Sequence, residues 1–235
     1  QQVSSAASDV YKRQERNLTI DEDTYEVLMQ KQKERARSSS NFNSIIPESL
    51  DIKGETDFLG YESYSSTSNV IEIISNSSSQ EEINEGEEAL ILLDQTPFYA
   101  ESGGQVGDTG LIKSNNSIFE VYDTQKKGDH FLHLGHVKSG SLKKSDSVVA
   151  EINSEQRNRI KSNHSATHLL HSALREVLGE HVEQKGSLVE ESRLRFDFAH
   201  NSSIDAEDIL AIEDLINAEI KKNSESVTEI LPISE

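Results

Sequence analysis

Between residues 88 and 150 the sequence holds four short runs rich in β-forming residues, and Gly, Asn, Asp or Ser separates each run from the next. The runs are EALILLD, SIFEVYD, HFLHLGHV and SVVAEI. Several short strands at such spacing, each ended by turn residues, are typical of a small barrel. A further strand is expected at VIEIIS (70–75). This pattern predicts a β-barrel subdomain over residues 46–150.

A different pattern begins after the barrel. Residues 153–178 favour one long helix, with Asn153 as the N-cap and Gly179 as the stop. Two strand candidates follow, QKGSLV and RLRFDF, and Asp205 can cap a last amphipathic helix. The predicted fold class is therefore α+β: the barrel, then a helix–hairpin–helix core over 151–235.

The beginning of the chain predicts a third part. Residues 24–37 (TYEVLMQKQKERAR) have helix-forming composition, so residues 15–45 are expected to end a helical domain. Residues 1–14 resemble translated adaptor sequence and are expected to be non-native. Because both ends look cut, we expect an internal fragment of a longer protein.

Composition sets limits on the partners and the compartment. The formal net charge of −19 repels phosphate backbones, so charge alone disfavours nucleic acid. No run approaches the roughly 20 apolar residues that span a bilayer, and no signal-peptide core is visible. The absence of cysteine fits a cytosolic protein. We expect a cytoplasmic chain with no membrane partner.

The segment HSATHLLH places His164 and His168 four residues apart, a spacing that lets two imidazoles share a metal such as zinc. The same spacing also occurs by chance on a solvated polar face. No Glu follows His164, so the H-E-x-x-H metalloprotease pattern is absent, and His171 is expected to be a bystander. The histidines lie opposite the apolar stripe of the predicted helix, which suggests a solvent-side ridge; the stripe is Ala166, Leu170, Ala173, Leu174 and Val177.

Two further segments each allow a structural and a functional interpretation. The glycine-rich segment TPFYAESGGQVGDTG (96–110) is either a hairpin connection within the barrel or a loop whose backbone amides meet a polar ligand. Its spacing matches neither a P-loop nor a dinucleotide fingerprint. Lys185, Arg193 and Arg195 form a small basic cluster near Gln184, either as surface charge on a hairpin or as the edge of a pocket.

Taken together and in this order, four stretches resemble the editing region of the alanyl-tRNA synthetase family. They are DQTPFYAESGGQVGDTG, NHSATHLLHSALREVLG, QKGSLV and RLRFDFAH. The resemblance runs from about residue 15 to the end and is strongest over 88–200. The 24–37 helix and SSSNF resemble the end of that family's tRNA-recognition domain.

The resemblance implies a site that hydrolyses serine or glycine wrongly attached to tRNA(Ala). It implies that His164 and His168 bind zinc together with a Cys and a His from a later C-x3-H motif, which we expect beyond residue 235. It implies that Thr167 and Gln184 are catalytic-pocket residues that decide which aminoacyl group is tolerated. The ATP-dependent attachment of alanine would lie in a part of the parent enzyme outside this fragment.

Other functions stay open at this point. A free-standing trans-editing deacylase would begin near the glycine-rich segment rather than after a long helix. The related editing domain of threonyl-tRNA synthetase would share H-x3-H but not FYAESGGQVGD. A silent module that only holds tRNA or bridges domains would contain the same fold without hydrolysis.

Overall fold

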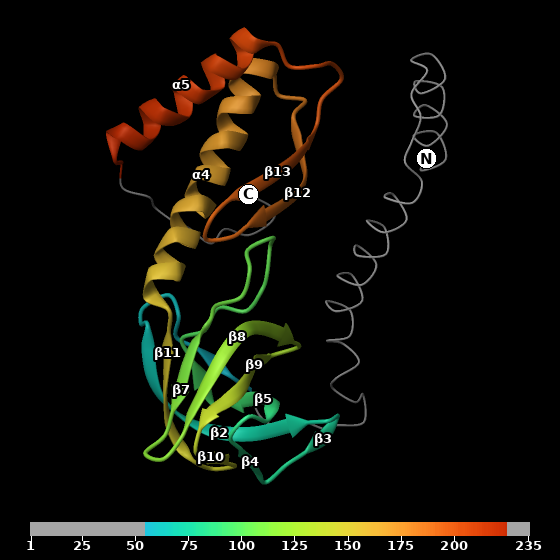
Figure 1. The fold of residues 1–235 in the computed structure, drawn as a ribbon. Coiled ribbons are helices and arrows are strands. Elements are labelled where there is room, and N and C mark those ends of the chain that lie inside the picture. The colour runs from blue at the N-terminus through green and yellow to red at the C-terminus, as the bar shows by residue number, and fades with distance from the viewer. Residues whose placement is uncertain (1–54, 225–235) are drawn as a thin grey trace, which may run out of the picture. The chain divides into compact units, whose positions relative to one another are not determined.

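The computed structural model describes residues 55–224, which form a mixed structure of strands and two helices (Figure 1). The predictions for residues 1–14 and 15–45 and for the last residues of the chain lie outside this range. The barrel region contains β1 (Asp57–Phe58), β2 (Ser65–Ser75), β3 (Ser78–Ser79), β4 (Glu82–Asn84), β5 (Glu88–Leu93), β6 (Gln95–Thr96), β7 (Gly110–Lys113), β8 (Ile118–Lys127), β9 (His130–Ser139), β10 (Ser141–Lys143) and β11 (Ser147–Ile152). The helical region contains α4 (Ser154–Leu178), β12 (Glu183–Val189), β13 (Leu194–Ala199) and α5 (Ala206–Lys222).

The strands close into a barrel, which confirms the predicted small-barrel subdomain. Strands β11, β7, β8, β9, β5 and β2 pair in that order, and antiparallel pairing of β11 with β2 closes the ring. Closure satisfies backbone groups that an open sheet would leave at its two edges. Along the first half of β2 and along β11, buried and exposed residues alternate, so one face of each of these stretches fills the interior. The interior cluster is Val70, Ile73, Ile83, Ala89, Ile91, Leu93, Phe98, Ile112, Phe119, Val121, Val137, Leu142, Val148, Ala150 and Ile152.

Two of the six strands of the ring differ most from the sequence prediction, and the short strands β1, β3, β4, β6 and β10 were not predicted either. Strand β2 begins at Ser65, five residues before the expected start at Val70, because its polar first half pairs with β11. Strand β7 lies at the end of the glycine-rich segment and was not predicted. Its four residues have no clear alternation, and their extended form depends on antiparallel pairing with β8 and β11. Both differences come from long-range pairing, which the local sequence does not encode.

Helix α4 begins and ends where the sequence predicts. The side chain of Asn153 accepts a hydrogen bond from the Gln156 backbone N–H at 3.1 Å, as an N-cap does. At the other end, Gly179 adopts φ +113° and its N–H donates to the Arg175 carbonyl at 3.0 Å. A side chain at Gly179 would be strained at that positive φ.

The hairpin β12–β13 and helix α5 pack on the C-terminal half of α4 (Figure 1). Asp205 caps α5 by accepting from the N–H groups of Glu207 and Asp208. The buried residues of this second cluster are Ala173, Leu174, Val182 and Ile212, with Phe196 and Phe198 packed against them. Within residues 55–224, neither helix is long and apolar enough to cross a membrane.

Candidate functional site

Two histidines on successive turns of α4 lie next to each other. The ring centroids of His164 and His168 are 5.1 Å apart, and the two rings are inclined by 28°. The ring of His168 is exposed, whereas His164 is only half-exposed. The helix therefore presents two imidazoles side by side, the arrangement that their spacing predicts.

The glycine-rich segment covers one side of His164, so the predicted solvent-side ridge is wrong at this residue. Nδ1 of His164 lies 2.7 Å from Oε1 of Gln105. An amide oxygen carries no hydrogen and can only accept, so Nδ1–H of His164 is the donor. Burial, and after it the nearby His168, lowers the pKa of His164 below its ordinary value. The neutral ring is the form in which imidazole binds a metal.

The glycine-rich segment connects β6 to β7 and pairs with the end of β12. The N–H of Val189 donates to the Gly104 carbonyl at 2.7 Å, and the N–H of Val106 donates to the Val189 carbonyl at 3.2 Å. A Cβ at Gly104 would lie 2.3 Å from Ser187 Oγ, and this glycine has φ +87°. Only glycine permits this approach. The segment therefore holds the barrel against the hairpin, and the backbone amides of Gln105 and Val106 are occupied by protein carbonyls.

A buried ion pair fixes the same segment to the first turn of α4. Asp108 and Arg157 are 2% and 5% exposed, and Nε of Arg157 donates to Oδ1 of Asp108 at 2.9 Å. The guanidinium also donates to the carbonyls of Gly60 at 2.8 Å and Pro97 at 3.0 Å. The Tyr99 N–H donates to Oδ2 of Asp108 at 2.8 Å. Both charges are thus paired and hydrogen-bonded, which burial demands.

Sequence reasoning missed this pair and Gln105. A signal existed for one partner: Arg157 lies three residues before Ile160 on the same helical face, where a lone arginine is unusual among residues that become buried. No local signal connects Gln105 with His164, because they are 59 residues apart.

The two predicted pocket residues lie in different surroundings. Thr167 is 7% exposed, and its hydroxyl donates to the Asn163 carbonyl one turn earlier at 2.9 Å. The hydroxyl oxygen keeps lone pairs that can accept. Gln184 is exposed on β12, beside an irregularity in the pairing with β13 that falls between Gln184 and Gly186.

His171 also departs from the solvent-side prediction, because its ring packs on Phe196 with centroids 5.2 Å apart. Its Nε2 is buried and has no hydrogen-bond partner within residues 55–224.

The expected basic cluster is neutralised by neighbouring carboxylates. Each of the three basic side chains is exposed and pairs with an acid: Lys185 with Glu183, Arg193 with the half-buried Glu190, and Arg195 with Asp197. These contacts favour surface charge on a hairpin over a basic pocket edge.

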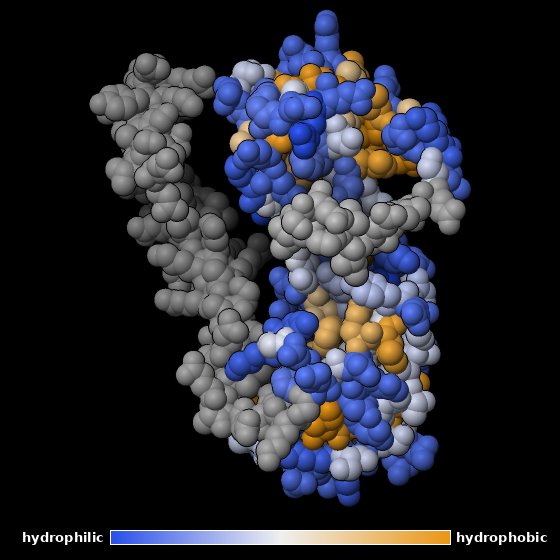
Figure 2. Space-filling view, turned by 180° about the vertical axis from the view of Figure 1, so that it is seen from behind, coloured by the Kyte–Doolittle hydropathy of each residue, from blue (hydrophilic) through white to orange (hydrophobic). Residues whose placement is uncertain are grey.

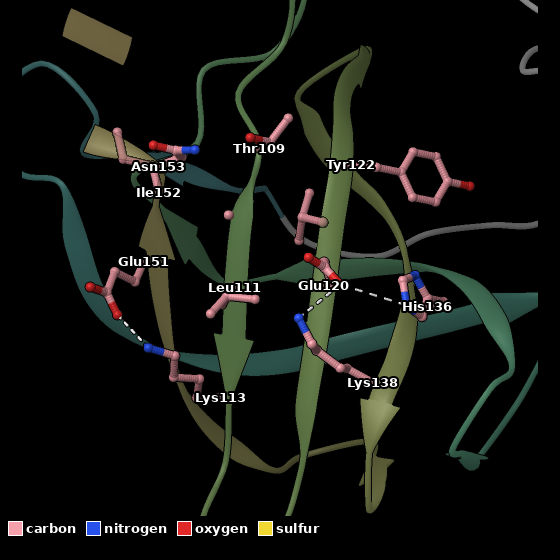
Figure 3. A pocket seen from close by; sticks show the side chains of 12 residues that line it. Thr109, Leu111, Lys113, Glu120, Tyr122, His136, Lys138, Glu151, Ile152 and Asn153 are labelled. Atoms are coloured by element: carbon pink, nitrogen blue, oxygen red, sulfur yellow. Dashed lines mark hydrogen bonds and ion pairs between the residues drawn. The ribbon is translucent and has the colours of Figure 1, made fainter. Parts of the chain in front are cut away.

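Open grooves border these elements within the described part of the chain. A groove of about 420 Å³ runs along α4 and begins at His168; it is lined by His168, His171, Ser172, Arg175, Glu176 and Glu180. A larger groove of about 500 Å³ lies on the outside of the barrel (Figure 3). In the larger groove Lys113 pairs with Glu151 at 2.7 Å, and Lys138 pairs with Glu120 at 3.3 Å. None of the sequence-predicted site residues lines the larger groove, so the groove on α4 is the one next to the candidate chemistry.

The donor set can be tested for a zinc site. Zinc takes neutral imidazole nitrogens in a tetrahedral set of four ligands, and His164 and His168 suit two of these positions. Across the described part of the chain, no group of three or more His, Cys, Asp or Glu side chains converges. The residues present therefore fit part of a zinc site, and further donors would have to come from elsewhere.

Comparison with known proteins defines the family. The profile described as "tRNA synthetases class II (A)" matches residues 10–156. The chain belongs to this family of class II (A) tRNA synthetases.

The relatives that the chain matches are alanine–tRNA ligases. The chain is 50% identical over 215 residues to an alanine–tRNA ligase of Pseudomonas syringae pv. syringae, an alignment that covers 92% of this chain and 25% of the relative. It is 49% identical over 215 residues to the alanine–tRNA ligase of P. syringae pv. tomato, with the same coverage. For Pseudomonas entomophila the identity is 48% over 219 residues, covering 93% of this chain and 25% of the relative. The resemblance to alanyl-tRNA synthetases is confirmed, and the chain spans about a quarter of the length of these relatives.

Proposed function

We propose that this region is the editing part of an alanine–tRNA ligase, which hydrolyses the ester of tRNA(Ala) mischarged with serine or glycine. The observation that carries the proposal is the His164–His168 pair, with one imidazole held by the glycine-rich segment and the other open to a groove. The family membership and the ligase relatives support it. The parent enzyme would use ATP to attach alanine in segments outside this chain, and its expected location is the cytoplasm.

In this proposal His164 and His168 supply two ligands of a zinc ion, and the remaining Cys and His come from a segment beyond residue 235. Bound zinc would polarise the ester or a water molecule and position the 3′ end of the tRNA. The chain's own residues orient the substrate and choose among aminoacyl groups. The two imidazoles must stay neutral to bind the metal, and the partly buried position of His164 favours that state.

Thr167 and Gln184 would decide which aminoacyl group is hydrolysed. A pocket that hydrogen-bonds the hydroxyl of serine rejects alanine because its polar groups would be left unpaired. The Thr167 hydroxyl can accept such a bond while it donates to the Asn163 carbonyl. The Gln184 amide is exposed and can both donate and accept.

The test is release of serine from seryl-tRNA(Ala) by the full-length ligase that contains this region. The double variant with His164→Ala and His168→Ala should lose serine release and keep ATP-dependent alanylation, because in this proposal alanylation takes place in another part of the parent enzyme. His200→Ala, which removes a histidine outside the pair, is the control and should retain both activities. A wild-type enzyme that attaches alanine but never releases serine would support the silent module instead.

Binding to tRNA is part of the same proposal. The net charge of −19 means that the contacts with phosphate must be made by basic surfaces that the net charge does not reveal. Basic contact surfaces would be local or lie in other parts of the parent enzyme. Native electrophoresis with tRNA across a salt series should show binding that weakens as salt increases, because phosphate contacts release counterions. Binding that ignores salt would contradict phosphate contacts.

A free-standing trans-editing deacylase remains the second candidate. The match to ligases over 92% of the chain, which includes sequence before the glycine-rich segment, favours a ligase. A parent protein that releases serine but cannot attach alanine would favour the trans-editing enzyme.

A further inference from the structure

One buried side chain outside the predicted site touches a proposed zinc ligand. Gln105 is 6% exposed, and its Oε1 lies 2.7 Å from Nδ1 of His164. Burial of an amide this deep is stable only when its polar atoms have partners. The contact therefore adds one short hydrogen bond to the Asp108–Arg157 pair between the glycine-rich segment and α4.

The backbone around Gln105 is held from three directions. Gln105 and Ser102 exchange backbone hydrogen bonds at 2.9 and 3.1 Å across the Gly103-Gly104 turn. Gly104 and Val106 on either side of Gln105 bond to Val189 of β12. Three residues later, Asp108 is fixed to Arg157 at the start of α4. The fixed backbone, the burial of the Gln105 side chain and its hydrogen bond together hold the amide oxygen beside His164.

The direction of this bond decides which ring nitrogen of His164 can act. Because Oε1 only accepts, Nδ1 holds the proton and Nε2 carries the lone pair. Metal-binding histidines commonly donate their other ring N–H to a carbonyl or carboxylate, which fixes both the tautomer and the ring orientation. His168, one turn later, has no side-chain hydrogen bond to another residue in the stretch from 55 to 224.

We propose that Gln105 is a positioning residue that holds His164 as the Nδ1–H tautomer and directs Nε2 toward the ligand shared with His168. The metal part of this inference rests on the proposed function. The tautomer part concerns the chain alone and can be measured without metal or tRNA. The glycine-rich segment is then a support for the site, and the close approach of Gly104 to Ser187 of β12 is the packing contact that depends on glycine.

The first experiment measures the ring ¹⁵N chemical shifts of His164 in the chain at pH 8, where an ordinary imidazole is neutral. The wild type should show Nδ1 protonated and Nε2 unprotonated. Gln105→Leu removes the acceptor and should convert His164 to a mixture with substantial Nε2–H. Gln105→Glu keeps an acceptor at the same place and should restore the wild-type tautomer.

Matched controls separate positioning from a general loss of structure. Gln125→Leu removes a partly buried glutamine that bonds to Glu101 and Asp123, and it should leave the His164 tautomer unchanged. If Gln105→Leu does not fold, Gln105→Met keeps the unbranched shape, still lacks an amide oxygen, and carries the same expectation. An unchanged Nδ1–H tautomer in a folded acceptor-free variant overturns the proposal.

The second experiment measures zinc affinity in the full-length ligase by competition with a chelator. Loss of an outer hydrogen-bond partner typically weakens metal binding about 10–100-fold, and Gln105→Leu should fall in that range while Gln105→Glu recovers. A tautomer change without any loss of zinc affinity would overturn the metal part. Absence of serine release by the wild type would overturn the proposed function while the tautomer result still stands.

Discussion

The barrel and the helical region each contain a histidine that is wholly or partly buried, and the two histidines differ in how many of their ring nitrogens are hydrogen-bonded. In the barrel, His133 is fully buried; its Nδ1 bonds to the Ile91 carbonyl at 2.9 Å and its Nε2 to the Thr96 hydroxyl at 2.7 Å. In the helical region, His164 uses one ring nitrogen in a protein hydrogen bond and is only half-covered. A histidine with both ring nitrogens hydrogen-bonded within the protein is a polar part of the core. A histidine with one ring nitrogen free of protein hydrogen bonds can bind a ligand.

The same contrast extends to packing. The barrel encloses a large apolar cluster with many side chains that have no exposed surface. The helical region buries a smaller cluster and leaves Ile209, Leu210 and Ile220 of α5 exposed. Hydrophobic surface is visible on both regions in Figure 2. The barrel thus has the larger buried core, and contacts of the glycine-rich segment join the helical region to it.

The largest effect is expected from breaking the ion pair that joins the two regions. Arg157→Met leaves the Asp108 carboxylate buried without its partner, which should lower the free energy of unfolding by about 3–5 kcal/mol. Arg159→Met removes an exposed i,i+4 pair with Glu155 and should cost less than about 1 kcal/mol. Urea unfolding of both variants measures the difference, and equal losses would contradict the role given to Arg157.

The barrel histidine should make stability depend on pH. Burial lowers the pKa of His133 from 6.5 to about 4. Between these values the unfolded chain binds a proton at this residue and the folded chain does not, so stability falls as pH falls from 6.5 towards 4. The full loss is about 3 kcal/mol, from a shift of that size.

Unfolding free energies of the wild type and His133→Gln, measured from pH 7 to pH 4, test this expectation. The variant should lose this part of the slope whatever its stability at pH 7. An identical slope in both proteins would show that His133 does not stay neutral in the folded state.

A smaller effect is expected from the glycine pair in the segment that joins the regions. Both Gly103 and Gly104 have positive φ, so alanine is strained at either position, but only at Gly104 would the new Cβ meet Ser187. Gly104→Ala should therefore destabilise by about 1–3 kcal/mol more than Gly103→Ala, the range for forcing atoms into packed structure. Hydrogen exchange at the Val189 amide should rise in Gly104→Ala alone, and equal exchange in both variants would contradict the close approach.

The smallest signal is expected from zinc added to this 235-residue chain. Two imidazoles leave the metal short of ligands, so titration calorimetry should show weak binding or none. His164→Ala and His168→Ala should each remove whatever weak binding is seen. Nanomolar affinity would mean that the chain supplies a complete site by itself.

Local chemistry allowed much of the fold to be predicted. Asn153, Gly179 and Asp205 end or begin their helices through contacts with residues at most four positions away, so their roles can be read from neighbouring letters. The buried strands of the barrel were visible as apolar runs between turn residues. Strand β7 and the first half of β2 were missed, because their extended form depends on partners far along the chain.

The same division holds for the candidate site. The spacing of His164 and His168 follows from 3.6 residues per helical turn, so the sequence by itself determined that the two imidazoles are neighbours. Only the tertiary structure decided that Gln105 and Arg157 meet residues of the other region, across separations of 59 and 49 positions. A helix fixes the direction of a side chain relative to its own axis, but closure of the barrel and docking of the glycine-rich segment decide what that side chain meets.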